Sequence, residues 1–215
     1  MKEQEMLCEK CRHSLTIISG EICRVCGRML ELTLPEYVEG GHCVDCIRWE
    51  KRDEWDGYFF ENRSLFVYNE PMKQFIAKFK FRGDVVLVES VKVKWRALWR
   101  KQFKDQLIVP IPLSEERLYE RGFNQSLILA HLLTDDVKDL LTRPHHLEKQ
   151  SKKSRIERVR SIKNVFDIKA EKVTGKEIML IDDVYTTGTT VRNAACLLYE
   201  HGATRVSSLT LARAI

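Results

Sequence analysis

The chain has 215 residues, of which 44% are hydrophobic and 31% are charged, and its formal net charge is +5. This length allows one full hydrophobic core and a small additional module, and the composition is that of a soluble globular protein. No apolar run approaches the roughly 20 residues of a membrane span, and the N-terminal MKEQEM lacks the apolar region of a secretory signal. We therefore expect a cytoplasmic protein without a membrane span.

The first 50 residues are predicted to be a small zinc-finger module. Six of the seven cysteines form three C-x-x-C pairs: Cys8 and Cys11, Cys23 and Cys26, and Cys43 and Cys46. In a cytosolic chain this spacing is typical of metal sites rather than disulfides, and two such pairs make a tetrahedral zinc site. We favour the second and third pairs as the complete site, and the alternative combines the first and second pairs. Four thiolates leave no open coordination position, so the zinc is expected to be structural.

Residues 51–105 are predicted to be a linker followed by a basic segment. Within residues 61–110 there are 11 basic and 5 acidic side chains, a net charge of +6, so a polyanionic partner is expected to meet this part. A strand is predicted over residues 64–68, a helix over 72–81 and a longer helix over 85–104. The candidate nucleic-acid contacts are Lys73, Lys78, Lys80 and Arg82. The alternative is an amphipathic helix with a solvated lysine face.

The stretch IMLIDDVYTTGTT, residues 178–190, predicts a buried strand, two carboxylates at its tip, a glycine loop and a helix. Unpaired N–H groups and the dipole at a helix N-terminus favour a phosphate, and Gly188 allows close approach of the backbone. Asp182 and Asp183 can accept hydrogen bonds from sugar hydroxyls or hold Mg²⁺ through water. A site for one phosphate beside acceptors for a diol predicts a ribose 5-phosphate ligand. The alternative is an ordinary strand, loop and helix with an acidic surface tip.

Three further stretches have residues suited to ligand binding. Pro110 and Pro112 bound a loop after the predicted strand QLIVP, where backbone groups are expected to remain free for a ligand. RGFNQ, residues 121–125, is rich in cationic and amide groups and precedes an apolar helix. Residues 148–155 are basic and predict a mobile loop able to close over a ligand.

The stretch at residues 178–190 resembles the PRPP-binding motif of type I phosphoribosyltransferases. With the C-x-x-C pairs, KFKFRGD, VPIPLS, RGFNQ and the basic loop, nearly the whole chain resembles the ComF family, and most closely its ComFC-type competence proteins. The resemblance implies an α/β fold with a parallel, Rossmann-like sheet, in which a phosphoribosyltransferase-like core at residues 106–215 follows the zinc module. It also implies DNA uptake during natural transformation, with a ComFA-type helicase as partner.

The resemblance also implies roles for individual residues in binding PRPP with Mg²⁺. Asp182 and Asp183 take the ribose diol and Mg²⁺ and are the candidate catalytic residues. The 5-phosphate is bound by Thr186, Thr187, Gly188, Thr189 and Thr190. Pro110, Ile111 and Pro112 line the pyrophosphate loop, and the candidate cations and donors around it are Arg121, Gln150, Lys152 and Arg158.

This chain departs from the family in its first cysteines. ComFC-type proteins often have four C-x-x-C pairs, and here the first is missing, which leaves Cys8 and Cys11 without their usual partners. We hypothesise either that the chain starts at an internal methionine or that this lineage lost the first pair. Either version favours Cys23, Cys26, Cys43 and Cys46 as the zinc ligands.

Two functions are consistent with these features. The first is a phosphoribosyltransferase that uses PRPP and an acceptor that the sequence does not identify. The second is a non-catalytic competence factor that keeps the fold, binds at most a ribose phosphate, and acts on single-stranded DNA and a helicase.

Overall fold

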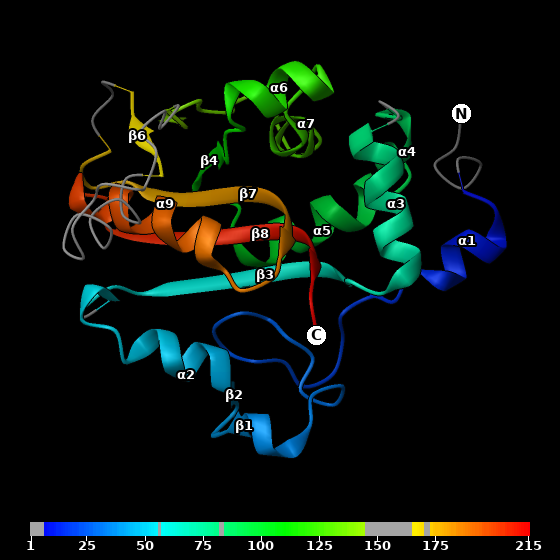
Figure 1. Cartoon of the computed structure of the whole chain (residues 1–215), viewed down its shortest axis with the longest axis horizontal. Helices are drawn as coiled ribbons and strands as arrows, with labels where there is room; N and C mark the ends of the chain where they lie inside the picture. The colour runs from blue at the N-terminus through cyan, green and yellow to red at the C-terminus, as the bar shows by residue number, and fades with distance from the viewer. Residues whose placement is uncertain (1–6, 56, 82–83, 145–164, 170–172) are drawn as a thin grey trace, which may run out of the picture.

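A parallel β-sheet forms the centre of the protein (Figure 1). The structure is a computed structural model and describes residues 7–55, 57–81, 84–144, 165–169 and 173–215. The four strands lie in the order β3-β8-β7-β4, and every neighbouring pair is parallel. Their bounds are β3 Phe60–Val67, β8 Arg205–Arg213, β7 Glu177–Tyr185 and β4 Leu107–Pro110. Because the strands are parallel, their carboxyl ends share one edge of the sheet.

Helices cover both faces of this sheet, as expected for parallel strands. One face presents Ile178, Leu180 and Val206 to α9 (Thr189–Glu200) and to the N-terminal module. The other face presents Met179, Ile181 and Leu209 to a second set of helices. These are α3 (Glu70–Phe81), α4 (Val86–Glu89), α5 (Lys92–Gln102) and α7 (Gln125–His131).

Short elements complete the described chain. They are α1 Glu9–Ser14, η2 Pro35–Tyr37, β1 Val38–Glu39, β2 His42–Cys43, α2 Val44–Glu50, η3 Asp53–Trp55, α6 Glu115–Arg121, β5 Leu141–Thr142 and β6 Asp167–Ile168. No helix in the described ranges is long and apolar enough to cross a bilayer.

The part of the N-terminal module that contains β1, β2 and α2, with the four buried cysteines, packs directly on the sheet and lies below β3 in Figure 1. Its buried cysteines share one hydrophobic core with Trp49, Trp55, Phe60 and the inner side of α9. The buried amide of Asn62, in β3, donates to the carbonyl oxygen of Cys26 at 2.9 Å and accepts from Ser208 Oγ at 2.8 Å. The module is therefore joined to the sheet by shared apolar packing and by buried hydrogen bonds.

Three elements differ from the sequence-based expectations. The strand expected at residues 64–68 begins earlier, and as β3 it joins the same sheet as the core strands. The long helix expected over residues 85–104 is wrong: it is divided into α4 and α5 at Ser90 and Val91. Here the Ser90 hydroxyl donates to the Leu87 carbonyl at 2.6 Å, and β-branched valines at 85, 86, 88, 91 and 93 weaken helix propagation. Strand β7 also continues past Ile181 to Tyr185, because it stays paired with β8.

Candidate functional site

The candidate site begins where β7 passes into α9. Strand β7 ends at Tyr185, residues 186–188 form the loop, and α9 starts at Thr189, so the predicted order of strand, loop and helix is confirmed. Thr186, Thr187 and Thr189 are exposed, and the Thr187 and Thr189 hydroxyls lie 2.9 Å apart. Thr190 follows in the first helical turn. A 12-residue helix thus directs its N-terminal N–H groups toward a rim of hydroxyls, an arrangement that suits an anion.

Gly188 is required by the shape of this loop. It caps α9 in the left-handed conformation, with φ of +82°. A Cβ at this position would lie 2.1 Å from the hydroxyl oxygen of the buried Tyr185 and 2.4 Å from its ring carbon Cζ. The loop therefore needs glycine both for its backbone conformation and for the contact with Tyr185.

The two carboxylates lie within β7 near its carboxyl end, and they have different partners. Asp182 Oδ1 accepts from the Ser126 hydroxyl at 3.1 Å and from the Asp183 backbone N–H at 2.9 Å. Asp183 forms an ion pair with Lys80 of α3. Burial, followed by the charge of Asp183, raises the pKa of Asp182 to about 7. The strand end thus combines one carboxyl group that titrates near neutrality with one carboxylate that has a cationic partner.

Lys80 lies in this site rather than on the outer face of α3. Its side chain is about one-fifth exposed and reaches Asp183. Of the other nucleic-acid candidates, Lys73 is exposed and pairs with Glu70 at 3.4 Å, and Lys78 is exposed. Arg82 lies outside the described residues. The structure therefore separates Lys80 from the lysines that face solvent on the same helix.

The loop after β4 is held by the RGFNQ segment. Ile111 donates its N–H to Ile181 O at 2.9 Å, and its carbonyl accepts from Asn124 Nδ2 at 3.0 Å. The backbone groups of Ile111 are thus both used within the protein, contrary to the expectation of free groups at this position. Pro110 ends β4 and Pro112 is partly buried beside it. Arg121 Nη1 donates to Gln125 Oε1 at 2.8 Å, which fixes the arginine beside the start of α7.

Some of the predicted ligand-binding positions fall outside the described residues. These are Gln150, Lys152 and Arg158. Two other residues of the site were not found from the sequence. Ser126 approaches Asp182 through the start of α7, and Arg143, whose pKa is lowered by burial and by the charge of Arg117, interacts electrostatically with Asp182. Only the three-dimensional contacts distinguish this serine and this arginine from others in the chain.

Four cysteines form a group that can hold a metal such as zinc. The sulfur atoms of Cys23, Cys26, Cys43 and Cys46 all lie within 4.8 Å of one another, and all four residues are buried. Four thiols in this arrangement fit the tetrahedral sulfur coordination of structural zinc. The structure thus brings together the second and third C-x-x-C pairs, the combination favoured from the sequence.

Among the described residues, the remaining pair has no further potential ligands grouped around it. Cys8 and Cys11 are exposed at the start of α1, where Cys8 Sγ accepts the Cys11 N–H at 3.4 Å. Across the ranges that the structure describes, the four buried cysteines are the only group of three or more potential ligand residues that can hold a metal.

Residues 143–215 match the family model of the phosphoribosyl transferase domain. Competence protein ComFC of Bacillus subtilis strain 168 is 42% identical over 216 residues, covering 99% of this chain and 86% of that protein. The chain belongs to the ComFC family. Together with the parallel sheet, this confirms a type I phosphoribosyltransferase-like α/β fold with a cysteine cluster near its N-terminus.

Other relatives are similar over nearly the whole length of the chain. Competence protein ComFC of Streptococcus pneumoniae strain R6 is 34% identical and covers 98% of this chain and 89% of that protein. DNA utilization protein YhgH of Salmonella typhimurium strain LT2 is 29% identical and covers 97% of each. The similarity therefore includes both the cysteine module and the sheet.

Proposed function

We propose that this protein binds PRPP or a related ribose 5-phosphate, with Mg²⁺, at the carboxyl edge of the sheet, and that it acts in DNA uptake during transformation. One observation carries the ligand proposal: the α9 N-terminus and its exposed threonines adjoin two carboxylates at the end of the same strand. Family membership supports the same ligand, since the matching domain model is that of phosphoribosyl transferases. The names of the relatives, competence and DNA utilization proteins, support the cellular role.

In this proposal the 5-phosphate lies against Thr186, Thr187, Gly188 and the first turn of α9. Asp182 and Asp183 accept the ribose hydroxyls or hold Mg²⁺ through water. Asp183 must then share its oxygens with, or release, Lys80, which makes Lys80 part of the ligand site. Arg121 and Arg143 supply positive charge toward the pyrophosphate. Mg²⁺ would neutralise phosphate oxygens as pyrophosphate leaves the ribose, so that catalysis rests on positioning and electrostatics.

Calorimetric titration with PRPP and Mg²⁺ tests the ligand proposal. Wild type is expected to bind, and the double variant D182N/D183N is expected to lose most of the heat. Asp136 is exposed and pairs only with Lys138 among the ion pairs of the described residues, so D136N is the matched control and should bind as wild type does. Equal heats from wild type and the double variant would refute the assignment of these carboxylates.

A second candidate function is a non-catalytic factor that binds single-stranded DNA and a ComFA-type helicase. The observation in its favour is the solvent-facing position of Lys73, Lys78, Lys94, Arg100 and Lys101 on α3 and α5. Phosphate contacts release counterions, so the logarithm of the binding constant should fall linearly with that of the salt concentration. Replacing Lys78 and Lys94 by glutamine should make the slope shallower by about one per contact removed. A salt-independent affinity would refute the DNA proposal.

The cellular role has its own test. We propose a cytoplasmic protein, since reduced thiolates in a metal site suit that compartment. Transformation efficiency with the D182N/D183N protein is expected to fall in a naturally competent host, at unchanged protein level. Full efficiency would indicate that the ribose phosphate site is dispensable for uptake, and would favour the DNA-binding role alone.

A further inference from the structure

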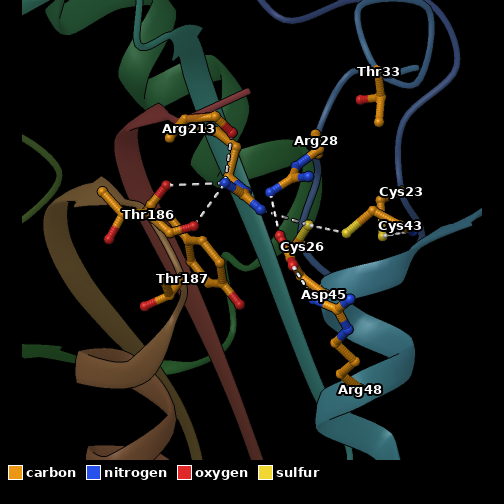
Figure 2. A network of polar contacts seen from close by, with 12 residues as sticks. Cys23, Cys26, Arg28, Thr33, Cys43, Asp45, Arg48, Thr186, Thr187 and Arg213 are labelled. Carbon is orange, nitrogen blue, oxygen red and sulfur yellow. Dashed lines mark hydrogen bonds and ion pairs between the residues drawn. The ribbon is translucent and has the colours of Figure 1, made fainter. Parts of the chain in front are cut away.

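Direct polar contacts join the four-cysteine site to the loop proposed for the 5-phosphate. Arg213, the last residue of β8, lies between them and is only 2% exposed (Figure 2). Its Nη2 donates to Cys26 Sγ at 3.3 Å. Its Nη1 donates to Thr186 O at 2.8 Å and to Tyr185 O at 3.3 Å. One guanidinium group therefore contacts a metal-site sulfur, the last backbone carbonyl of β7 and the first backbone carbonyl of the loop.

A second contact comes from the helix that carries a cysteine of the site. Cys46 and Trp49 both lie in α2, three residues apart, and therefore on one side of the helix. The Trp49 indole Nε1 donates to Thr187 O at 3.0 Å. A metal that fixes Cys46 would therefore also restrain the indole of Trp49. This indole in turn holds Thr187, the second residue of the loop.

A third contact supports the first turn of α9. The Arg192 guanidinium is buried over the rings of Trp49, Trp55 and Phe60, with ring centroids 4.7–5.0 Å from its central carbon. Arg192 Nε donates a hydrogen bond to the Tyr185 hydroxyl oxygen at 3.3 Å. Aromatic rings from α2, η3 and β3 therefore hold the start of the helix that follows the loop.

The charges explain why the metal should matter to Arg213. Zinc with four thiolates has a net charge of −2, and a buried charge needs a partner. Arg213 is the buried cation that contacts a cysteine sulfur. A metal held by the four cysteines would also fix Cys26 Sγ, which lies 3.3 Å from Nη2 of Arg213. Removing the metal would therefore release one end of the bridge that Arg213 makes to Tyr185 O and Thr186 O.

We propose that Arg213 and Trp49 are positioning residues through which metal binding at the four cysteines shapes the Thr/Gly loop and raises its affinity for a 5-phosphate. This inference rests on the proposed function for its ligand, although the coupling itself is a property of the loop. By reciprocity, the phosphate ligand must tighten metal binding by the same factor. The cysteine module then regulates the ligand site as well as stabilising the fold.

The test compares two ligands in the full-length protein. The proposed function assigns ribose 5-phosphate to the Thr/Gly loop and pyrophosphate to Arg121 and Arg143, so each ligand is titrated separately in the presence of Mg²⁺. R213M and W49F are expected to weaken ribose 5-phosphate about tenfold, within the usual range of coupling between sites, and to leave pyrophosphate within about twofold. W49F keeps an aromatic ring for Arg192 and removes the N–H donor. R205M is the matched control, because Arg205 lies in the same strand and pairs with Glu61, away from the loop.

Zinc content and thermal stability are measured for every variant. Metal retained in R213M, with ribose 5-phosphate alone weakened, supports the coupling. Unchanged ribose 5-phosphate affinity in both variants overturns it and leaves the proposed function intact. Equal losses for both ligands, in step with a lower melting temperature, also overturn it, since they indicate a general folding defect. R213K keeps the charge but cannot contact both Cys26 Sγ and Thr186 O. Its affinity for ribose 5-phosphate should therefore lie between those of wild type and R213M.

A measurement without ligand separates the coupling from the proposed function. Amide hydrogen exchange at residues 185–189 is compared between zinc-loaded protein and protein with zinc removed by a chelator, and between wild type and R213M. Faster exchange in this loop, with the strand interiors of β7 and β8 still protected, supports the inference. Unchanged amide exchange in this loop refutes the coupling, whether or not wild type binds ribose 5-phosphate. Faster exchange in a protein that does not bind ribose 5-phosphate refutes only the proposed ligand.

Discussion

Replacing Gly188 by alanine should destabilise the protein through two separable effects. The left-handed backbone, with φ of +82°, costs a non-glycine residue about 1–2 kcal/mol. The new Cβ would also lie 2.1 Å from the Tyr185 hydroxyl oxygen, and Tyr185 is buried against Arg192 and Arg213. Overpacking of this kind costs about 1–3 kcal/mol. The total is about 2–5 kcal/mol, or a melting temperature lower by about 5–15 °C for a chain of this size.

Gly175 provides the matched control, because only one of the two effects applies there. Its φ is +74°, and a Cβ there would have no heavy atom within 4 Å. G175A should therefore show the backbone cost alone. Urea and thermal unfolding of both variants measure the difference, and titration with ribose 5-phosphate should show lost affinity only for G188A. A destabilisation of G188A no larger than that of G175A would refute the role of the Tyr185 contact.

Three further outcomes follow from the site. Because the pKa of Asp182 is raised to about 7, above about 3.9 for an unfolded aspartate, the free energy of unfolding should fall as the pH rises from 4 through 7. The free energy of unfolding of D182N, measured in urea, should not show the decrease that comes from Asp182. Parallel pH profiles for wild type and D182N would contradict the raised pKa of Asp182. For the mostly buried pair of Lys80 and Asp183, a double-mutant cycle on unfolding should give about 1–3 kcal/mol, against about 0.5 kcal/mol or less for the exposed Lys73 and Glu70. Metal analysis should give one zinc per chain, and chelation should lower the melting temperature, whereas two zincs would contradict a single four-cysteine site.

Local sequence patterns predicted those parts of the structure that depend on neighbouring residues. The apolar run at residues 178–181 predicted a strand buried on both faces, and C-x-x-C spacing marked the six cysteines from which the four that meet in space are drawn. Gly188 was expected to allow close approach, and its position beside Tyr185 requires it. Each of these signals lies in the residue type itself and in its immediate spacing.

Tertiary contacts determined what the sequence could not predict. Lys80 belongs to a helix with several lysines, and only the packing of α3 on the sheet directs this one to Asp183. Ser126, 56 residues away in sequence, donates to Asp182, and Arg143, 39 residues away, interacts with it electrostatically. Likewise, β7 was expected to end before its carboxylates, but pairing with β8 continues the strand beyond them. No local pattern records such contacts.

The position of β8 has a consequence for the order of events during synthesis. This strand, residues 205–213, lies between β3 and β7, so β3, which ends at Val67, has an antiparallel bridge to Ile17 but no parallel partner until residues 205–213 have been made. The four cysteines, by contrast, lie within residues 23–46 and can meet early. A nascent chain can therefore bind a metal at its four cysteines long before its parallel sheet closes.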